Sequence, residues 1–249
     1  MRVMTHALLL TVAVLGFTQP KPIVVHMIGD STMADKPKPE VNPERGWGQA
    51  LPQYFDHGVV VRNHAVNGRS TKSFIDEGKW AAVLAELKRG DYVFIQFGHN
   101  DEKVQDSSRY TSPCTAYRRN LERFVNESRA KGAIPVLFTP IVRRKFNEHG
   151  TLEDTHGVYA LVVRDVARDL RVPFVDLEML TEDLVRGAGP DASKQLYVYV
   201  DSGAIAAFPA PRHDDTHLSP HGASEVAKLA ARALKTAVPA LAPHILGVN

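Results

Sequence analysis

The 249-residue sequence contains a single cysteine, Cys114, and carries almost no net charge. One cysteine excludes an intramolecular disulfide and any metal site built from several cysteines. The formal net charge of +2 and the lack of a long basic run argue against nucleic acid as a partner. The sequence also lacks a Gly/Ser-rich linker, an internal repeat and a low-complexity segment. These absences leave one large globular domain as the expected organisation.

The first 20 residues differ in pattern from the rest of the chain. Arg2 and His6 precede an apolar stretch, residues 7–17, and Pro20 follows it. A short basic start followed by about 7–15 apolar residues is typical of a secretory signal peptide, and a membrane span needs about 20 residues. We therefore expect residues 1–20 to be a signal peptide and residues 21–249 a single domain, secreted or periplasmic and without stable membrane insertion. An uncleaved N-terminal helix or anchor is the alternative.

Short apolar runs alternate with helix-period segments along the remaining chain. The predicted strands are residues 23–28, 59–62, 92–97, 134–139 and 173–175. The predicted helices are residues 80–88, 117–130, 155–170 and 220–236. This alternation predicts an α/β domain with a parallel sheet covered on both faces, and five strands fit a flavodoxin-like order. Residues 36–44, with three prolines, and residues 143–154 are predicted to be surface loops.

Polar stretches occur at the ends of the predicted strands. Gly29-Asp30-Ser31 follows the first strand, Asn67-Gly68 comes shortly after the second, and residues 98–101 directly follow the third. Because binding sites in doubly wound sheets form beyond the carboxyl ends of the strands, these three stretches should lie together. A fourth stretch, residues 214–217, can reach the same edge from the loop before the last helix.

The side chains in these stretches have the complementary chemistry of nucleophilic catalysis. The hydroxyl of Ser31 is a weak nucleophile until a base takes its proton. His217 can act as that base, and Asp214 can bind its other ring nitrogen and stabilise the imidazolium. The Ser31 backbone N–H, the Gly68 N–H and the Asn100 side-chain amide can then stabilise an oxyanion.

The four stretches, in this order, resemble the sequence blocks of the SGNH (GDSL-type) hydrolases. The segments GDSTMAD, GWGQALPQYF, NHAVNGRSTKSF, FIQFGHND and DDTHLSPHGA further resemble the rhamnogalacturonan acetylesterase branch of that family, over residues 23–233. The resemblance implies a flavodoxin-like three-layer α/β/α sandwich with a five-stranded parallel sheet. It also implies an SGNH-type hydrolase domain that cleaves esters with no metal and no cofactor.

Carried over residue by residue, the resemblance implies Ser31 as nucleophile, His217 as base and Asp214 as the residue that orients it. Ser31, Gly68 and Asn100 are then the oxyanion hole, and Asp30 supports the site. The expected function is a serine esterase that removes O-acetyl groups from a plant cell-wall polysaccharide or oligosaccharide, with rhamnogalacturonan (pectin) as the expected polymer.

Several alternatives to this function stay open. The same family fits acetylxylan, sialic-acid or lipid esters as substrates. A non-catalytic carbohydrate-binding protein and a metal-dependent phosphoesterase are alternatives from other classes. At single positions, Ser31 could cap a helix, Gly68 could only permit a left-handed turn, and Asn100 could belong to an Asx turn.

Other residues near these stretches also have a structural and a functional interpretation. Asp215 competes with Asp214 for the orienting role, although the family spacing favours Asp214. His99 and Asp101 are expected to brace their loop, and His213 and His221 to be structural. Trp47 is expected in the core, with a sugar-binding groove as the alternative. The basic run of Arg143, Arg144 and Lys145 is expected to be a solvated face, or else to attract an acidic polymer.

Overall fold

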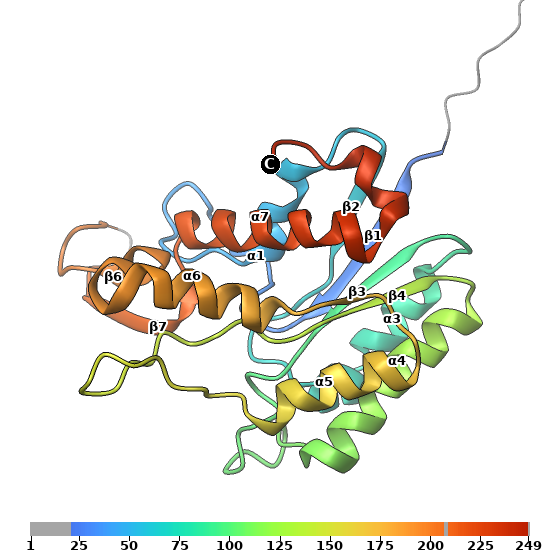
Figure 1. Cartoon of the computed structure of the whole chain (residues 1–249), viewed down its shortest axis with the longest axis horizontal. Coiled ribbons are helices and arrows are strands. Elements are labelled where there is room, and N and C mark those ends of the chain that lie inside the picture. The colour runs from blue at the N-terminus through green and yellow to red at the C-terminus, as the bar shows by residue number, and fades with distance from the viewer. Residues whose placement is uncertain (1–20, 207–208, 249) are drawn as a thin grey trace, which may run out of the picture.

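Five parallel strands form the central sheet of the protein, whose computed structural model describes residues 21–206 and 209–248 (Figure 1). The strands are β1 (Ile23–Gly29), β2 (Val59–Asn63), β3 (Tyr92–Gln96), β4 (Ile134–Phe138) and β5 (Phe174–Val175). Their order is β2-β1-β3-β4-β5, and all neighbours pair in parallel. The α/β fold with five parallel strands in a flavodoxin-like order is thereby confirmed. The expected signal peptide lies outside the described residues.

Side chains of the strands alternate between two hydrophobic cores, one on each face of the sheet. Phe94 and Phe138 point into one core, whereas Ile95 and Leu137 point into the other. Because successive residues of a strand face opposite sides, a run that is apolar at every position supplies both cores. This explains why the central strands read as continuous apolar runs.

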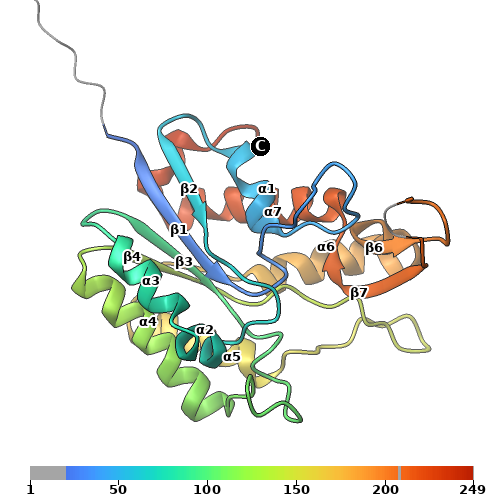
Figure 2. The ribbon, with the colours of Figure 1, turned by 180° about the vertical axis from the view of Figure 1, so that it is seen from behind.

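Seven helices of the described residues cover the two faces of the sheet (Figures 1 and 2). One face carries α1 (Trp47–Ala50), α6 (Leu177–Ala192) and α7 (Pro220–Ala237). The other carries α2 (Thr71–Asp76), α3 (Lys79–Glu86), α4 (Arg118–Ala130) and α5 (Val158–Asp169). The result is the predicted three-layer α/β/α sandwich. None of these helices is both long and apolar enough to cross a membrane.

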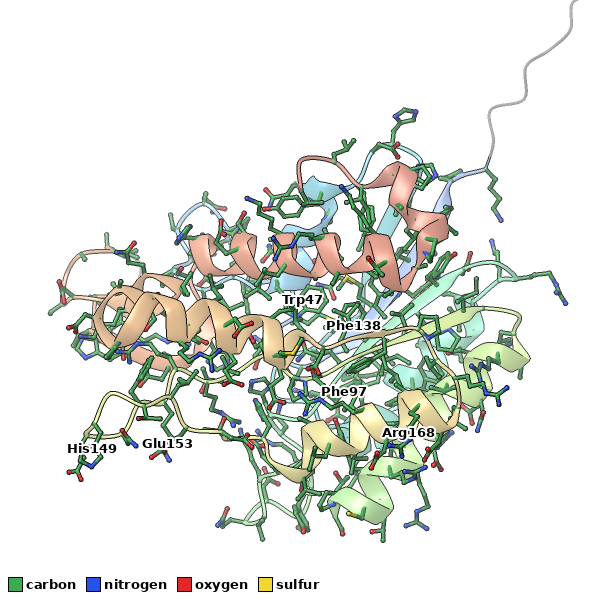
Figure 3. The ribbon with its side chains drawn as sticks, in the orientation of Figure 1. Trp47, Phe97, Phe138, His149, Glu153 and Arg168 are labelled. Atoms are coloured by element: carbon green, nitrogen blue, oxygen red, sulfur yellow. The ribbon has the colours of Figure 1, made fainter. Side chains whose placement is uncertain are left out.

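Trp47 lies in the core beside Phe138 (Figure 3). Its side chain is fully buried, its ring centroid is 5.5 Å from that of Phe138, and its Nε1–H donates to Gln96 Oε1 at 2.5 Å. The structural interpretation of Trp47 therefore holds, and the ring is not part of a sugar-binding groove.

Two elements beyond the predicted set lie between β5 and the last helix. The first is α6, whose helical pattern is interrupted at Gly189, where φ is 76° and Pro190 follows. The second is an antiparallel hairpin of β6 (Tyr197–Val200) and β7 (Arg212–Leu218), separate from the main sheet. Figure 1 shows this hairpin beyond the carboxyl ends of the central strands.

The hairpin corrects one sequence prediction, because residues 214–217 belong to β7 and not to a loop. The segment has no strand-like apolar alternation, since of its seven residues only Leu218 is buried. Its position is held by polar contacts, among them the Arg45 N–H that donates to the Leu218 carbonyl at 2.9 Å. The chain then enters α7 directly, where the Ser219 hydroxyl accepts the Gly222 N–H at 3.0 Å.

Candidate active site

The turn after β1 places Ser31 at the carboxyl edge of the sheet. The Ala34 N–H donates to the Asp30 carbonyl at 3.0 Å and closes the turn. Gly29 is needed before it, because a Cβ at this position would lie 2.7 Å from the Gln96 carbonyl oxygen on β3. Ser31 is 8% exposed, so its side chain lies at the boundary between the core and solvent.

Ser31, His217 and Asp214 form a continuous hydrogen-bonded chain. Ser31 Oγ lies 2.8 Å from His217 Nε2, and His217 Nδ1 lies 2.8 Å from Asp214 Oδ2. The second carboxylate oxygen of Asp214 accepts the backbone N–H groups of Thr216 and His217, each at 2.9 Å. With Nδ1–H donating to the carboxylate, Nε2 carries the lone pair that faces the serine hydroxyl. The structure thus brings the three residues together in the order that proton transfer from a serine requires.

Arg212 holds the outer side of Asp214. Its Nη2 lies 2.7 Å from Asp214 Oδ2 and 2.7 Å from Glu44 Oε2. Partial burial alone would raise the pKa of Asp214, but its hydrogen bonds with His217 and its ion pair with Arg212 hold that pKa well below the usual range. The carboxylate is therefore charged wherever the imidazole can act as a base.

Lys36 carries a buried ammonium group directly behind the nucleophile. Its Nζ donates to the Ser31 carbonyl at 2.6 Å and to Asn67 Oδ1 at 2.6 Å, and it pairs with Glu44 Oε1 at 2.7 Å. Lys36 is 3% exposed and Glu44 is 9% exposed, so the prediction of a surface loop over residues 36–44 is wrong at both ends. A buried cation of this kind is tolerated because an anion and two oxygen acceptors compensate its lost hydration.

Glu44 joins Lys36 to Arg212, and Arg212 binds Asp214. This network of alternating charges connects the turn that carries Ser31 with the strand that carries His217. The sequence analysis missed it, since Lys36 and Glu44 lie in a proline-rich stretch whose path is set only by the folded chain. The only hint in the sequence was a basic residue, Lys36, at one end of that stretch and an acidic residue, Glu44, at the other.

Asp215 has a different partner from Asp214. Its Oδ1 lies 2.6 Å from Arg144 Nη1 and 2.6 Å from the Tyr199 hydroxyl. The geometry therefore favours Asp214 over Asp215 beside His217. His213 and His221 are exposed, and the ring of His213 stacks on Tyr199 with centroids 5.2 Å apart.

The basic run after β4 is paired residue by residue. Arg144 is 8% exposed and binds Asp215, Arg143 pairs with Glu102, and Lys145 pairs with Glu153 at 2.8 Å. The expected solvated face is therefore wrong for Arg144, which is buried, and only the Lys145 side chain of the run is largely exposed. The contacts fit a structural role better than the attraction of an acidic polymer.

Besides Ser31, the predicted oxyanion donors are Gly68 and Asn100, which lie in two loops that contact each other. Gly68 has φ of +76°, a left-handed conformation that favours glycine. Asn100 is 2% exposed, and its side-chain amide donates to the Arg69 carbonyl at 3.1 Å while its Oδ1 faces Arg109 Nη1 at 3.4 Å. Arg109 thereby fixes which end of the Asn100 amide presents N–H groups. Lys36 completes the arrangement by joining Asn67, the neighbour of Gly68, to the Ser31 backbone.

A hollow of about 560 Å³ opens beside Gly68. It is lined by Asn67, Gly68, Arg69, Lys72, Ser73, Asp76, Glu77, Ser108 and Arg109. Charged and polar side chains make up its whole lining apart from the glycine. It is therefore a site for a polar ligand more than for an acyl chain.

Asp30, His99 and Asp101 lie buried beneath the site. Asp30 Oδ1 accepts the backbone N–H and the hydroxyl of Thr32 at 2.9 and 2.8 Å, which fixes the turn that contains Ser31. Asp101 accepts the hydroxyls of Thr71 and Thr111 at 2.5 and 2.8 Å, which holds its loop to the start of α2. These contacts fit the bracing roles expected for Asp30 and Asp101.

The pKa values of these buried groups are shifted in different directions. Burial lowers the pKa of His99 to about 4, although the Asp30 carboxylate opposes this shift. For Asp30, burial is outweighed by His99 and Thr32, which lower the pKa to about 2. Burial raises the pKa of Asp101 to about 7, against the hydrogen bonds from Thr71 and Thr111.

Comparison with known proteins gives consistent matches over most of the chain. Residues 27–224 match the GDSL-like lipase/acylhydrolase family. The chain is 42% identical over 226 residues to the rhamnogalacturonan acetylesterase RhgT of Bacillus subtilis, covering 91% of this chain and 95% of that protein.

Solved structures match as well. The crystal structure of the Bacillus subtilis protein YxiM is 28% identical with a TM-score of 0.74, covering 88% of this chain and 58% of that chain. Axe2, an acetylxylan esterase from Geobacillus stearothermophilus, is 18% identical with a TM-score of 0.57, covering 87% of this chain and 94% of that chain. At that identity the likeness to Axe2 shows the fold alone.

His99 should make the protein less stable in acid. The unfolded chain binds a proton at His99 with a pKa of about 6.5, whereas the folded chain binds it only at about 4. Acidification from pH 6.5 to 4 therefore favours unfolding, and the loss is expected to reach about 2–3 kcal/mol. Replacing His99 with Gln removes this titrating group. Between pH 6.5 and 4, the free energy of unfolding of H99Q should therefore fall by about 2–3 kcal/mol less than that of the wild type.

Asp101 has the opposite effect on stability, because its pKa is raised in the folded state. Lowering the pH from about 7 to about 4 therefore stabilises the fold through this group. The test is consequently the difference between H99Q and the wild type, measured by urea unfolding at each pH. Parallel profiles for the two proteins would show that His99 does not titrate in this way.

Proposed function

The chain belongs to the GDSL-like lipase/acylhydrolase family and is a carboxylic ester hydrolase, and from this premise we propose that it removes O-acetyl groups from rhamnogalacturonan. The observation that carries the proposed mechanism is the hydrogen-bonded chain from Asp214 through His217 to Ser31. In this proposal Ser31 is the nucleophile, His217 the base and Asp214 the residue that holds the imidazole.

In the first half of the reaction, Ser31 Oγ attacks the acetyl carbon while His217 Nε2 takes the hydroxyl proton. Negative charge develops on the former carbonyl oxygen. The N–H groups of Ser31, Gly68 and the Asn100 amide are the proposed donors to it. The tetrahedral intermediate collapses when His217 gives the proton to the sugar oxygen and the bond between that oxygen and the acetyl carbon breaks. The sugar leaves as an alcohol, and Ser31 remains acetylated.

In the second half, a water molecule replaces the sugar next to His217. The imidazole takes a proton from the water, whose oxygen attacks the acetyl carbon, and acetate leaves as Ser31 recovers its proton. Asp214 stays ionised throughout, because its hydrogen bonds and Arg212 hold its pKa low. Its task is to stabilise the imidazolium that forms twice in each cycle.

Two observations support an acetylated, acidic polysaccharide as the substrate. The first is the 42% identity to a protein named rhamnogalacturonan acetylesterase over 91% of this chain. The second is the polar hollow beside Gly68, whose cations Arg69, Lys72 and Arg109 pair with Glu77, Asp76 and Asp106. These ion pairs are partly exposed and contribute little free energy, so the cations can exchange a partner for a carboxylate of the substrate. Uronic-acid units carry one carboxylate each, and cations of the hollow would attract them.

The other candidate functions fit these observations less well. A lipid ester would call for an apolar groove beside Ser31, whereas the lining of the hollow is polar. Acetylxylan lacks the carboxylates that the cations of the hollow would bind. A carbohydrate-binding protein without catalysis needs no serine aligned with an imidazole and a carboxylate. A metal-dependent phosphoesterase would need free ligand atoms, but both ring nitrogens of His217 are engaged by Ser31 and Asp214.

We also propose that the protein is secreted or periplasmic. The support is the pattern of residues 1–20, a basic start followed by a short apolar stretch. Export fits an enzyme whose polymeric substrate does not enter cells. Expression of the full-length chain in a bacterial host should release a protein whose first residue, by N-terminal sequencing, lies near Lys21. Recovery of the uncleaved chain in the cytoplasm would contradict export.

Replacing Ser31 with Ala should lower kcat for p-nitrophenyl acetate by roughly 10⁶-fold, because it removes the nucleophile. The folded state should persist, and circular dichroism can check it. Asp214→Asn should cost about 10⁴-fold, because the imidazole loses its orienting acceptor. Asp215→Asn is the matched control, with an expected loss below about tenfold. Full activity of Ser31→Ala would refute the nucleophile, and equal losses at the two aspartates would refute the assignment of Asp214.

The partly exposed cations of the hollow predict a preference for acidic polymers. The double variant Arg69→Gln/Lys72→Gln should raise KM for acetylated rhamnogalacturonan roughly fivefold more than KM for acetylated xylan, since exposed charges contribute up to about 1 kcal/mol each. The difference should shrink with added salt. Lys145→Gln, from the paired basic run, is the control and should not separate the two polymers. Equal KM changes for both polymers in the double variant would argue against an acidic substrate.

A further inference from the structure

A buried histidine lies in β1, beside Arg62 of β2 and Val93 of β3. The neighbours Val25 and Met27 belong to one core, so His26 faces the opposite layer, where α3 lies. The side chain of His26 is 1% exposed. Imidazole is costly to bury without partners for both ring nitrogens. The contacts of His26 therefore decide what this position does.

His64, just after β2, supplies the first partner. His26 Nδ1 and His64 Nε2 are 3.0 Å apart, and the two rings lie within 5° of parallel with centroids 5.2 Å apart. At this separation only one proton fits between the two nitrogens, so one lone pair already faces the other ring. Two nitrogens bound at about 2.0–2.1 Å to a tetrahedral zinc ion lie roughly 3.3 Å apart. The two nitrogens now face each other nearly in line, so a zinc ion can replace the shared proton only if the rings tilt until both lone pairs point at the ion.

Asp91 faces the other nitrogen of His26. Its Oδ2 lies 3.5 Å from His26 Nε2 and also accepts the Lys88 N–H at 2.8 Å, which anchors the carboxylate. A carboxylate behind a histidine orients the ring and increases the basicity of its other nitrogen, an arrangement that metal-binding histidines commonly have.

Glu86, the last residue of α3, supplies a third ligand atom. One atom each from His26, His64 and Glu86 lie within 4.8 Å of one another, the one such group of His, Cys, Asp or Glu among the described residues. Glu86 now pairs with Arg62 at 3.1 Å, but both side chains are about half exposed, with 47% and 50% of their surfaces accessible. An exposed ion pair of this kind contributes little free energy, so Glu86 can exchange Arg62 for a metal ion.

We propose that His26, His64 and Glu86 bind a divalent transition-metal ion with the ligand preferences of zinc. Two imidazoles and one carboxylate are a common zinc donor set, and a water molecule would complete the tetrahedron. The ion would join β1, the end of β2 and α3, and none of its three ligands is among the residues proposed for catalysis. The site is independent of ester hydrolysis, and its expected effect is stabilisation of the fold.

Titration calorimetry with ZnCl₂ on the untagged protein tests the proposal. The wild type should bind one zinc ion per chain, and its thermal midpoint should rise with zinc concentration. His64→Ala and Glu86→Gln should each weaken binding at least about tenfold. His149→Ala, at an exposed histidine on the periphery (Figure 3), is the matched control and should bind zinc as the wild type does. Cobalt in place of zinc should give the absorption of a tetrahedral site.

Two results would overturn the proposal. One is the lack of saturable zinc binding by the wild type at concentrations up to about 1 mM. The other is wild-type zinc affinity in His64→Ala or in Glu86→Gln, which would mean that any bound zinc has other ligands, such as His217. Glu86 is on the surface, so Glu86→Gln gives an answer even if His64→Ala fails to fold. In either case the histidine pair would serve only to satisfy buried nitrogens.

Discussion

The hydrogen bond between His217 Nε2 and Ser31 Oγ joins two positions that are 186 residues apart in the chain. It can form only if the strand order brings the turn after β1 to the edge of the sheet that the β6–β7 hairpin overhangs. The polar contacts around it serve the same end. Asp214 fixes the imidazole, Arg212 and Glu44 hold the carboxylate, and Lys36 ties the far end of this network to the backbone of Ser31.

Much of this arrangement was predictable because simple rules govern it. The central strands are apolar at nearly every position, as a sheet covered on both faces requires, so their number and parallel direction followed from the sequence. The polar stretches at Ser31, Gly68 and Asn100 follow strand ends, and parallel strands end at one edge. The short spacing from Asp214 to His217 limits how far the carboxylate can lie from the ring.

The features that were missed depend on contacts between distant segments. The α6 helix is kinked at Gly189, and packing of Leu177 and Val185 against the core holds the segment before the kink. β7 has a polar sequence, and its conformation is set by pairing with β6 and by the hydrogen bonds of Asp214. Glu44 and Asn67 compensate the lost hydration of the buried Lys36 ammonium group, and no local sequence pattern predicts such contacts.

The hairpin has a consequence for how the site could be switched. Asp214 and His217 lie on the same strand and are bonded to each other, while Ser31 belongs to the main sheet. A shift of the hairpin would carry the carboxylate and imidazole as one rigid pair, so the imidazole would keep its tautomer while its distance to the serine changed. A molecule bound between the hairpin and the sheet would thus separate the imidazole from the serine and leave the hydrogen bond between His217 and Asp214 in place.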